Sequence, residues 1–519
     1  MQKKLFIFFV TGLISVSSFA QKVLDITSFG AIADGKTVNT KAIQKAIDSC
    51  SKLGGGKVYF PKGTFITGAL KLKSYVNLNF ETGAVLKGSS NVDDYKLDGI
   101  TRGMFYGENL TDVAITGEGE INGNAVTFFN PSKMHTYIDF DKKYVRQGQA
   151  FFDALKPTDG PMFYEKRPDM VCVIMHSENV KLEGVRFVDA PTWTIRIGDC
   201  QNVVVNGISI LNNVLVPNSD GIHITISRNV RVSNCNVEAG DDALIVSGFG
   251  DEINIDNASY GTVKKTYTYG NKTGMAENIV VTNCILRSFS AGIRIGYGRG
   301  NMRNLIFSNI VIHNSNRGIL MNAREKGSIE NVVFDNFLVE TKHQGGTWWG
   351  RGEPIHISSF PITKDSVNGT IKDINFKNFK IKSETGIVVW ANEMGKVSNI
   401  GFDNINLQIS NGKNVAAFGG NIDLRPTPDF ATNIFKRDLP AILFNNIDQV
   451  RMNAVNAKFT GTVPDFYTNG LEVVNSQNFS ITFSNFSSSA SKFPAALVTK
   501  SKNIDFKNNS VFEIKTLDK

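Results

Sequence analysis

The chain has few cysteines, and none lies in a motif that would bind zinc or support redox chemistry. Its 519 residues include five cysteines, and no two of them are spaced as C-x-x-C. Because five thiols cannot all pair within one chain, at least one is unpaired. The sequence therefore indicates neither a zinc site nor a dense disulfide framework. The five are Cys50, Cys172, Cys200, Cys235 and Cys284.

The chain also lacks clustered basic residues and, beyond its first residues, any long apolar run. The chain has 56 lysines and arginines against 48 aspartates and glutamates, which gives a formal net charge of +8. The basic residues are spread along the sequence. Nucleic-acid binding usually needs a basic patch or stripe, so no nucleic-acid partner is predicted. No later segment approaches the ~18 consecutive apolar residues that span a membrane. The hydrophobic fraction of 41% is nevertheless enough for an extensive core.

The N-terminal residues have the pattern of a secretory signal peptide. Lys3 and Lys4 precede the apolar run Leu5–Val10, and small residues end the segment at Ala20. This order of charged, apolar and small residues is typical of a cleaved signal peptide. We therefore predict a protein that is secreted or periplasmic, with a mature chain that begins at Gln21.

From about residue 170 onwards, one short pattern recurs along the chain. Each copy has an asparagine or aspartate followed by alternating apolar and polar residues, and this period of two predicts a β-strand. Intervals such as 229 − 202 = 27 and 399 − 373 = 26 are too long for a hairpin and too short for a domain. They indicate the turns of a solenoid. The copies are Gln201–Val205, Arg228–Val232, Glu277–Val281, Arg303–Phe307, Glu330–Phe334, Lys372–Phe376, Ser398–Phe402 and Lys502–Phe506.

Asparagine recurs five positions after the first asparagine or aspartate of these copies. Equivalent residues of a parallel β-helix stack about 4.8 Å apart, so amides at a tight bend can hydrogen-bond from turn to turn and tolerate a left-handed backbone. The sequence therefore predicts an asparagine ladder and an all-β parallel β-helix. The next position is apolar, and Cys235 and Cys284 occupy it, which predicts core side chains, with a disulfide as the alternative. The asparagines are Asn234, Asn283, Asn309, Asn336, Asn378, Asn404 and Asn508.

The N-terminal part of the mature chain and three interruptions depart from this period. Thr40 precedes Lys41–Ile47, whose apolar residues share one helical face, which predicts a short helix that caps the open end of the solenoid. Long loops on a rigid coil usually build or cover a binding groove. The interruptions are Ala125–Pro168, Phe249–Ala276 and Leu407–Arg437.

Three aspartates are expected to lie together on neighbouring turns. Asp220 and Asp241 are 241 − 220 = 21 residues apart, close to one turn, and Asp242 is adjacent. Their carboxylates should project from neighbouring coils on the same face. Like charges at close range raise the pKa of at least one member, which leaves a protonated general acid beside ionised bases. A separation of about 6.5–9.5 Å would leave room for the water of an inverting glycosidase.

Two other interpretations of the aspartates stay open at this point. Asp-Gly and Gly-Asp-Asp are common turn sequences, and acidic clusters on β-helices also bind calcium. A nucleophilic serine has little support, because no G-x-S-x-G motif is visible. The spacing is thus compatible with catalysis, a calcium site or simple turns.

The motifs around the aspartates resemble those of one known enzyme family. Asn218–Gly221 and Gly240–Asp242 are similar to the N-T/S-D and G-D-D signatures of the family 28 glycoside hydrolases, the polygalacturonases and rhamnogalacturonases. The similarity covers most of the mature chain to about residue 340. Other segments that resemble the opening of bacterial members are 29–31, 34–37, 54–56, 61–65 and 117–119.

The resemblance implies a secreted, pectin-degrading, inverting hydrolase with a right-handed parallel β-helix, no metal requirement and no other cofactor. Its partner would be a polysaccharide or oligosaccharide substrate. Carried over position by position, Asp241 would be the general acid, and Asp220 and Asp242 would hold and deprotonate the attacking water. Asn218 would support the same site.

Two family motifs that contact the substrate carboxylate are altered in this chain. Ala291 stands where the family has histidine, and Leu320 and Asn322 stand where it has arginine and lysine. These changes disfavour a simple polygalacturonan substrate unless a nearby group replaces the charge. Arg294 is the preferred substitute, with an exposed strand arginine as the alternative interpretation. Other candidates nearby are Tyr297, Arg299, Arg324 and Lys326.

Aromatic and imidazole side chains supply further candidates for substrate contact. Trp348 belongs to a tryptophan pair in the glycine-rich loop 345–354. Paired tryptophans are costly on a surface unless they stack against something such as a sugar, so a subsite wall is predicted, with closure of the β-helix flank as the alternative. His223 is predicted to face the groove, with no proton assigned to it, and Trp193 is predicted to lie in the core.

The sequence thus predicts one exported catalytic domain over residues 21–519 and three candidate functions. The leading one is hydrolysis of glycosidic bonds in a pectic or related acidic polysaccharide. A β-helical polysaccharide lyase, which would need calcium and a basic residue, is the second. A non-catalytic glycan-binding β-helix is the third, favoured if Ala291 and Asn322 signify lost activity. The sequence leaves the exact glycan, endo or exo action and the oligomeric state open.

Overall fold

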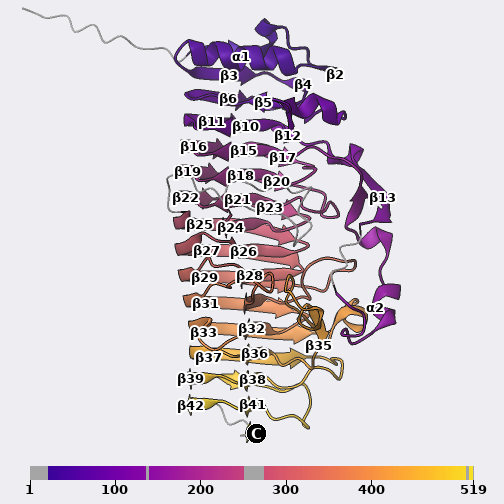
Figure 1. Ribbon diagram of the computed structural model, residues 1–519, viewed down its shortest axis with the longest axis vertical. Coiled ribbons are helices and arrows are strands. Elements are labelled where there is room, and N and C mark those ends of the chain that lie inside the picture. Colours follow the sequence, from indigo (N-terminus) through magenta and orange to yellow (C-terminus); the bar gives the residue numbers. More distant parts are fainter. Residues whose placement is uncertain (1–21, 136–139, 250–273, 510–512, 518–519) are drawn as a thin grey trace, which may run out of the picture.

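The computed structural model describes residues 22–135, 140–249, 274–509 and 513–517, which form a right-handed parallel β-helix (Figure 1). The turns stack along one axis, with the N-terminal helix at one end of the stack and the last strands at the other. Two long sheets of 23 and 14 strands form its sides. The predicted all-β parallel β-helix is confirmed. The predicted signal peptide, residues 1–20, lies outside the described residues.

The larger sheet contains the strands of the sequence repeat, paired in parallel with the equivalent strands of neighbouring turns. Its strands are β1 (Val23–Asp25), β2 (Asp34–Val38), β3 (Gly56–Phe60), β4 (Gly63–Thr67), β6 (Val76–Phe80), β7 (Ala84–Gly88), β11 (Thr111–Gly117), β12 (Glu120–Asn122), β16 (Glu178–Glu183), β17 (Arg186–Val188), β19 (Gln201–Asn206), β20 (Ser209–Leu211), β22 (Arg228–Ser233), β23 (Asn236–Ala239), β25 (Met275–Ser288), β27 (Asn301–Ser315), β29 (Ile329–Thr341), β31 (Ile371–Ser383), β33 (Val397–Ser410), β37 (Asp448–Thr460), β39 (Gln477–Thr482), β40 (Asn485–Phe486) and β42 (Lys502–Lys507).

The smaller sheet carries the candidate site. Its strands are β5 (Leu70–Lys71), β10 (Phe105–Glu108), β15 (Cys172–Met175), β18 (Ile195–Gly198), β21 (Ile222–Thr225), β24 (Leu244–Gly248), β26 (Ala291–Gly298), β28 (Arg317–Ala323), β30 (Ile355–Ser359), β32 (Ile387–Ala391), β36 (Ile442–Asn445), β38 (Leu471–Val474), β41 (Ala496–Thr499) and β43 (Ile514–Leu517). Neighbouring strands in this sheet are parallel, so residues at equivalent positions of successive turns lie side by side.

The core lies between the sheets and is built from the inward-facing residues of the repeat. Phe307, Phe334, Phe376 and Phe402 stack in one row, with ring centroids 5.0, 4.9 and 5.2 Å apart. Each ring is almost completely buried. Burial of apolar side chains on every turn supplies the main stabilisation. As in other solenoids, each turn packs its buried side chains against those of the adjacent turns.

The asparagine ladder predicted from the sequence is confirmed for pairs of neighbouring turns, and it is interrupted where Asn378 donates to Asp335. Asn336 Nδ2 donates to Asn309 Oδ1 at 2.8 Å, and Asn404 Nδ2 donates to Asn378 Oδ1 at 2.8 Å. These residues have φ between 54° and 60°, in the left-handed region that asparagine tolerates. The first asparagine of each copy forms a second ladder that the sequence interpretation missed. Its bonds join Asn229, Asn278, Asn304 and Asn331 at 2.9–3.2 Å.

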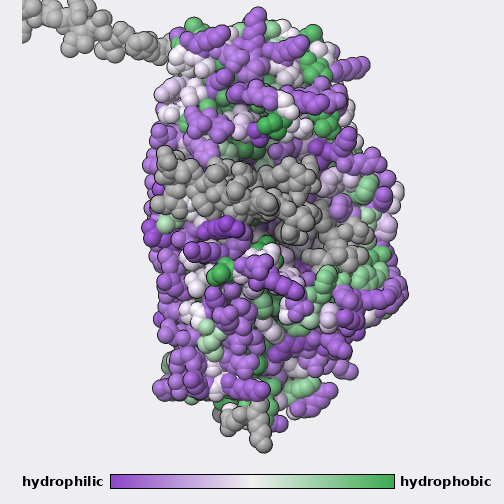
Figure 2. Space-filling model, viewed as in Figure 1, coloured by the Kyte–Doolittle hydropathy of each residue, from purple (hydrophilic) through white to green (hydrophobic). Residues whose placement is uncertain are grey.

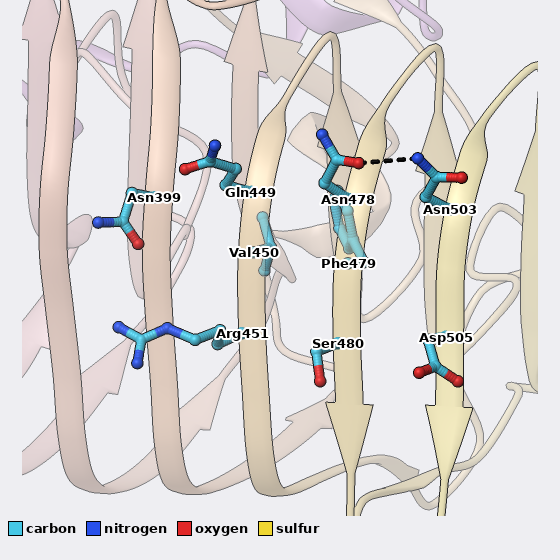
Figure 3. Close-up of a pocket in the computed structure, with 9 residues that line it drawn as sticks. All are labelled: Asn399, Gln449, Val450, Arg451, Asn478, Phe479, Ser480, Asn503 and Asp505. Atoms are coloured by element: carbon cyan, nitrogen blue, oxygen red, sulfur yellow. Dashed lines mark hydrogen bonds between the residues drawn. The ribbon is translucent and has the colours of Figure 1, made fainter.

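The C-terminal end of this second ladder borders a shallow pocket on the larger sheet (Figure 3). Asn503 donates to Asn478 at 2.9 Å, whereas Asn399 and Asn478 donate to aspartates of the preceding turns. Gln449 occupies the intervening position with φ of 57°, so a longer amide interrupts the row. The adjoining outward row consists of Arg451, Ser480 and Asp505. With a single carboxylate, this pocket has no acid pair for glycoside chemistry.

The helix α1 (Thr40–Lys52) covers the N-terminal end of the core, as predicted (Figure 1). Its buried face consists of Ile43, Ala46, Ile47 and Cys50. Cys235 and Cys284 lie in neighbouring turns, and both are buried free thiols. The other three cysteines are also free and buried. The predicted core role is therefore confirmed, and the alternative of a disulfide is wrong.

The first interruption forms a strap along the outside of the β-helix. The strap, defined as residues 125–169 where described, contains the antiparallel pair β13 (Phe129–Met134) and β14 (Met162–Tyr164) and the short helix α2 (Gln149–Asp153). In Figure 1, α2 lies beside β35 (Ile434–Lys436), far from it in sequence. Arg146 joins the two regions through a bond from its backbone N–H to Asn421 and an ion pair with Asp438.

Of the other two interruptions, the third begins at a different residue from the one predicted, and the second lies mostly outside the described residues. The third begins later than predicted, because β33 extends to Ser410, and it contains α3 (Val415–Phe418) and the pair of β34 (Asn421–Asp423) and β35. Nearly all of the second, Phe249–Ala276, lies outside the described residues. The last antiparallel pair is β8 (Lys96–Leu97) with β9 (Ile100–Thr101).

Polar residues cover most of the face shown in Figure 2, with apolar residues in small groups. Within the described ranges, no helix is both long and apolar enough to cross a membrane.

Candidate active site

The three predicted aspartates lie together beside the smaller sheet. Asp220 precedes β21, and Asp241 and Asp242 precede β24. The register Ile222↔Leu244 aligns Asp220 with Asp242 on adjacent turns. One oxygen from each carboxylate lies within 4.8 Å of the others, so the predicted proximity is confirmed. This spacing is shorter than the 6.5–9.5 Å expected between the carboxyl groups of an inverting enzyme.

Burial and mutual repulsion change the protonation of this cluster. Asp220 and Asp241 are 2% and 8% exposed. Burial, followed by the charge of Asp242, raises the pKa of Asp241 to about 7. Burial and the charges of Asp241 and Asp242 also hold the pKa of Asp220 well above its usual range. The cluster therefore retains protons close to neutral pH, as a general acid requires.

Arg294 places a positive charge against one member of the cluster. Its guanidinium forms an ion pair with the carboxylate of Asp242, and its carbon Cζ lies 4.6 Å from the ring centroid of Tyr297. The backbone N–H of Ala291 donates to Asp242 Oδ1 at 3.0 Å. Arg294 is only 6% exposed, so its interpretation as an exposed strand arginine is wrong. Its charge is directed at Asp242.

Asn218 supports Asp241, and an arginine from the strap supports Asn218. Asn218 has φ of 54°, and its Nδ2 lies 3.3 Å from Asp241 Oδ2, to which it donates. Arg167 Nη2 donates to Asn218 Oδ1 at 2.9 Å, and its guanidinium lies 3.9 Å from the ring centroid of Tyr164. The sequence interpretation missed Arg167, because it lies in an interruption without a repeat or motif. A buried arginine thus fixes the amide that contacts the predicted acid.

His223 contacts Asp220 from the adjoining strand. Its Nε2 lies 2.8 Å from Asp220 Oδ2, and its ring stacks on Trp193 with centroids 3.4 Å apart. Burial, then the charges of Arg294 and Arg196, keeps the pKa of His223 well below its usual range. His223 is thus a neutral imidazole that holds Asp220. Trp193 is buried, as predicted.

Trp348 is fully buried between the strap and the coil. Its indole N–H donates to the backbone oxygen of Asp159 at 2.8 Å, and its ring packs edge-on against Phe289 at 5.5 Å. Both contacts are with protein. This position agrees with the alternative interpretation, closure of the flank.

The polar contacts of the cluster favour acid–base chemistry over calcium binding. Within the part of the chain that the structure describes, these three carboxylates are the one group close enough together to hold a cation. However, calcium takes about 6–8 oxygen ligands, and here the N–H donors of Asn218 and Ala291 and the guanidinium of Arg294 contact oxygens of Asp241 and Asp242. These donors already compensate the negative charge that a cation would use.

A second buried charge network lies on the following turns. Ala291 is in register with Arg317, which pairs with Glu353, and Asp423 pairs with Arg425 through bonds of 3.0 and 2.8 Å. All the members are at most 2% exposed. Arg317 pairs with both carboxylates and Arg425 pairs with Asp423, while Arg324 and Arg351 are buried close to them. The members are Arg317, Arg324, Arg351, Arg425, Glu353 and Asp423.

The sequence model described as glycosyl hydrolases family 28 matches residues 50–328, more than half of the chain. The chain belongs to this family. A probable polygalacturonase of Vitis vinifera is 29% identical over 316 residues, which cover 57% of this chain and 55% of that protein. The exo-poly-alpha-D-galacturonosidase of Dickeya chrysanthemi is 28% identical over 398 residues, 70% of this chain and 63% of that protein. The chain thus spans between about half and two thirds of the length of these two relatives.

Among solved structures, the family 28 exopolygalacturonase of Yersinia enterocolitica is similar in fold. The match has a TM-score of 0.55 and 19% identity, and it covers 95% of this chain and 79% of that chain. At this identity the likeness shows the shared β-helix. The family membership and the fold therefore rest on independent comparisons.

Proposed function

We propose that this family 28 protein is an exported hydrolase that cleaves glycosidic bonds in a pectic or related acidic polysaccharide. The observation that carries the proposal is the group of three buried carboxylates within 4.8 Å of one another, held by protein donors. The names of the relatives, a polygalacturonase and a galacturonosidase, support the substrate class.

In the proposed mechanism, Asp241 donates its proton to the glycosidic oxygen as the bond to the leaving sugar breaks. Asp220 and Asp242 orient a water molecule, which attacks the anomeric carbon and transfers its proton to the carboxylate of Asp242. Arg294 holds Asp242, and the neutral His223 holds Asp220. The carboxylate oxygens lie closer together than the carboxyl groups of a typical inverting enzyme, so the inference that the anomeric carbon is inverted rests on the family motifs.

Activity is expected to fall as the pH rises through about 7. The general acid must be protonated, and burial raises the pKa of Asp241 to about 7, so the protonated fraction decreases about tenfold per pH unit above that value. The check is a profile of kcat from pH 4 to pH 9 in buffers of constant ionic strength. A rate that stays constant to pH 9 would exclude Asp241 as the acid.

Mass spectrometry of reaction products tests the proposed function. The protein would be incubated with polygalacturonate, rhamnogalacturonan and a neutral galactan, with and without a calcium chelator. We expect saturated products that gain one water and persist with the chelator. Unsaturated, chelator-sensitive products would indicate a lyase, and binding without any product would indicate a glycan-binding protein.

We also propose that the protein acts as one catalytic unit, residues 21–519, after removal of a signal peptide. N-terminal sequencing of exported protein is expected to begin at Gln21. An intact N-terminus at Met1 on exported protein would contradict the predicted cleavage.

A further inference from the structure

A groove of about 490 Å³ crosses the outer surface of the larger sheet. It spans four consecutive strands of that sheet, β27, β29, β31 and β33. The aspartates instead precede β21 and β24, which belong to the smaller sheet. The groove is therefore separate from the candidate active site.

One side of the groove is formed by the asparagine ladder. Asn309, Asn336, Asn378 and Asn404 border it, and all four residues are exposed. The bonds from Asn336 to Asn309 and from Asn404 to Asn378 each use one N–H. Because a side-chain amide has two N–H donors and an oxygen with two lone pairs, each asparagine keeps groups that can bond to a ligand.

The other side of the groove is an outward-facing row in which residues of neighbouring turns are in register. Val311 is followed in this row by Leu338, Lys380 and Asn406. Leu338 is 51% exposed, and Ile285, which continues the row on β25, is 47% exposed. Large apolar side chains that lie exposed side by side are typical of a binding surface. The row thus offers an apolar surface that ends at a lysine.

Lys380 gives the groove its positive charge. Both residues in register with it on the neighbouring strands are uncharged, and it forms no ion pair within the described ranges. Lys377 on the same strand is in register with Asp335 and Asp403, so carboxylates already flank it. Lys380 is therefore available to pair with a carboxylate of a ligand.

Together these side chains have the chemistry that binds an acidic polysaccharide. The apolar row can contact the C–H faces of sugar rings, the amides can bond to hydroxyl groups, and Lys380 can pair with a carboxylate. Neighbouring turns lie about 4.8 Å apart, close to the length of one sugar in an extended chain, so successive sugars meet equivalent side chains. We propose that the groove is a second, non-catalytic binding site for an extended acidic polysaccharide.

Such a site keeps the protein on a polymer while the aspartates act on another part of it. An apolar row alone would also suit a neutral glycan or a second copy of this chain, so the charge of Lys380 is the feature that selects an acidic partner. Binding in the groove needs no hydrolysis. The inference therefore goes beyond the proposed function and can be tested apart from it.

Affinity electrophoresis measures the binding, in native gels that contain polygalacturonate or a neutral galactan. All proteins carry Asp241→Asn, so that the polymer is not cleaved during the run. The double variant Leu338→Ser/Lys380→Glu removes apolar surface and reverses a charge at two exposed positions. We expect its dissociation constant for polygalacturonate to rise about tenfold, for one lost charge contact and one lost apolar contact. Lys45→Glu, at an exposed position of α1, changes the net charge equally and should bind as the parent does.

Three results would overturn the proposal. Binding by the double variant that equals binding by Lys45→Glu would exclude the groove as the site. Equal retardation in the neutral galactan would remove the role of charge. Sedimentation that shows a dimer for the parent and a monomer for the double variant, with unchanged binding to polygalacturonate, would assign the groove to a contact between two copies. Equal melting temperatures of the variants establish that the fold is intact.

Kinetics with Asp241 intact separate this site from the active site. A trisaccharide of galacturonate is too short to reach from the smaller sheet to the groove, whereas a long polymer can occupy both. The ratio of KM for the polymer to KM for the trisaccharide should therefore rise several-fold in Leu338→Ser/Lys380→Glu. An unchanged ratio would contradict the proposal. If neither substrate is cleaved, the proposed function fails, and the gels still decide whether the groove binds the polymer.

Discussion

Replacing Asp241 by asparagine is expected to lower kcat at least about 100-fold, the lower end of what general acid catalysis contributes. The amide has nearly the same shape as the carboxyl group but has no acidic proton to give to the leaving oxygen. Asp241 is the member of the cluster whose pKa is raised to about 7, mainly by burial, so it is protonated when the substrate binds below neutral pH. The measurement is kcat on the substrate identified by product analysis.

The stability of this variant distinguishes lost chemistry from lost structure. A raised carboxyl pKa penalises the folded state above the pKa, so Asp241→Asn should melt at the same temperature as wild type or higher at pH 8. The difference should disappear below about pH 4, where both the folded and unfolded forms are protonated. Asp112→Asn, on an exposed strand position, is the matched control. A wild-type rate in Asp241→Asn would refute the acid assignment.

The second large effect is expected at Asp423, in the buried charge network. Asp423→Asn should reduce the free energy of unfolding by about 3–5 kcal/mol, the cost of removing one partner from a buried ion pair. Asp423 Oδ2 accepts from Arg425 Nη2 and from the backbone N–H of Gly350, both at 2.8 Å. An asparagine has one acceptor oxygen instead of two, and the variant leaves Arg425 without its carboxylate partner. Urea unfolding followed by circular dichroism measures the effect.

The pH dependence of this loss provides an internal check. The neighbouring arginines hold the pKa of Asp423 well below its usual range against the effect of burial, and the pKa of Glu353 is lowered to about 2. A depressed carboxyl pKa stabilises the fold above the unfolded pKa, and this contribution fades as the pH falls toward the folded pKa. The loss of stability in Asp423→Asn should therefore be full above about pH 5 and smaller near pH 2–3.

Asp365→Asn, an exposed control, should stay within about 0.5 kcal/mol of wild type. A loss below about 1 kcal/mol in Asp423→Asn would contradict the account.

The fold could be predicted because its rules repeat on every turn. The alternation in segments such as Glu330–Phe334 determines which side chains face inward, and stacking places an asparagine where it can bond to the asparagine of the neighbouring turn. The capping helix could also be predicted, because the apolar residues of α1 have helical spacing in a segment without the strand repeat. The boundary of β33 was less predictable, because regular strand pairing continues into the sequence of the third interruption.

The site was only partly predictable, because its supports come from distant parts of the chain. The interval between Asp220 and Asp241 predicted their proximity, since a solenoid converts an interval into a stacked position. Arg167 and Asp423 have no such regularity: one comes from the strap and the other from β34, and tertiary packing alone brings them to their partners. Trp348 illustrates the opposite case, because its surface role was predicted from composition, whereas the strap covers it.

The anomeric configuration of the first product tests the central claim most directly. Proton nuclear magnetic resonance during the first minutes of hydrolysis would record the new reducing end before mutarotation. If Asp241 protonates the leaving sugar while Asp220 and Asp242 activate a water, the product must have the configuration opposite to that of the substrate. A product with retained configuration would contradict this account and would instead assign one of the three aspartates as a nucleophile.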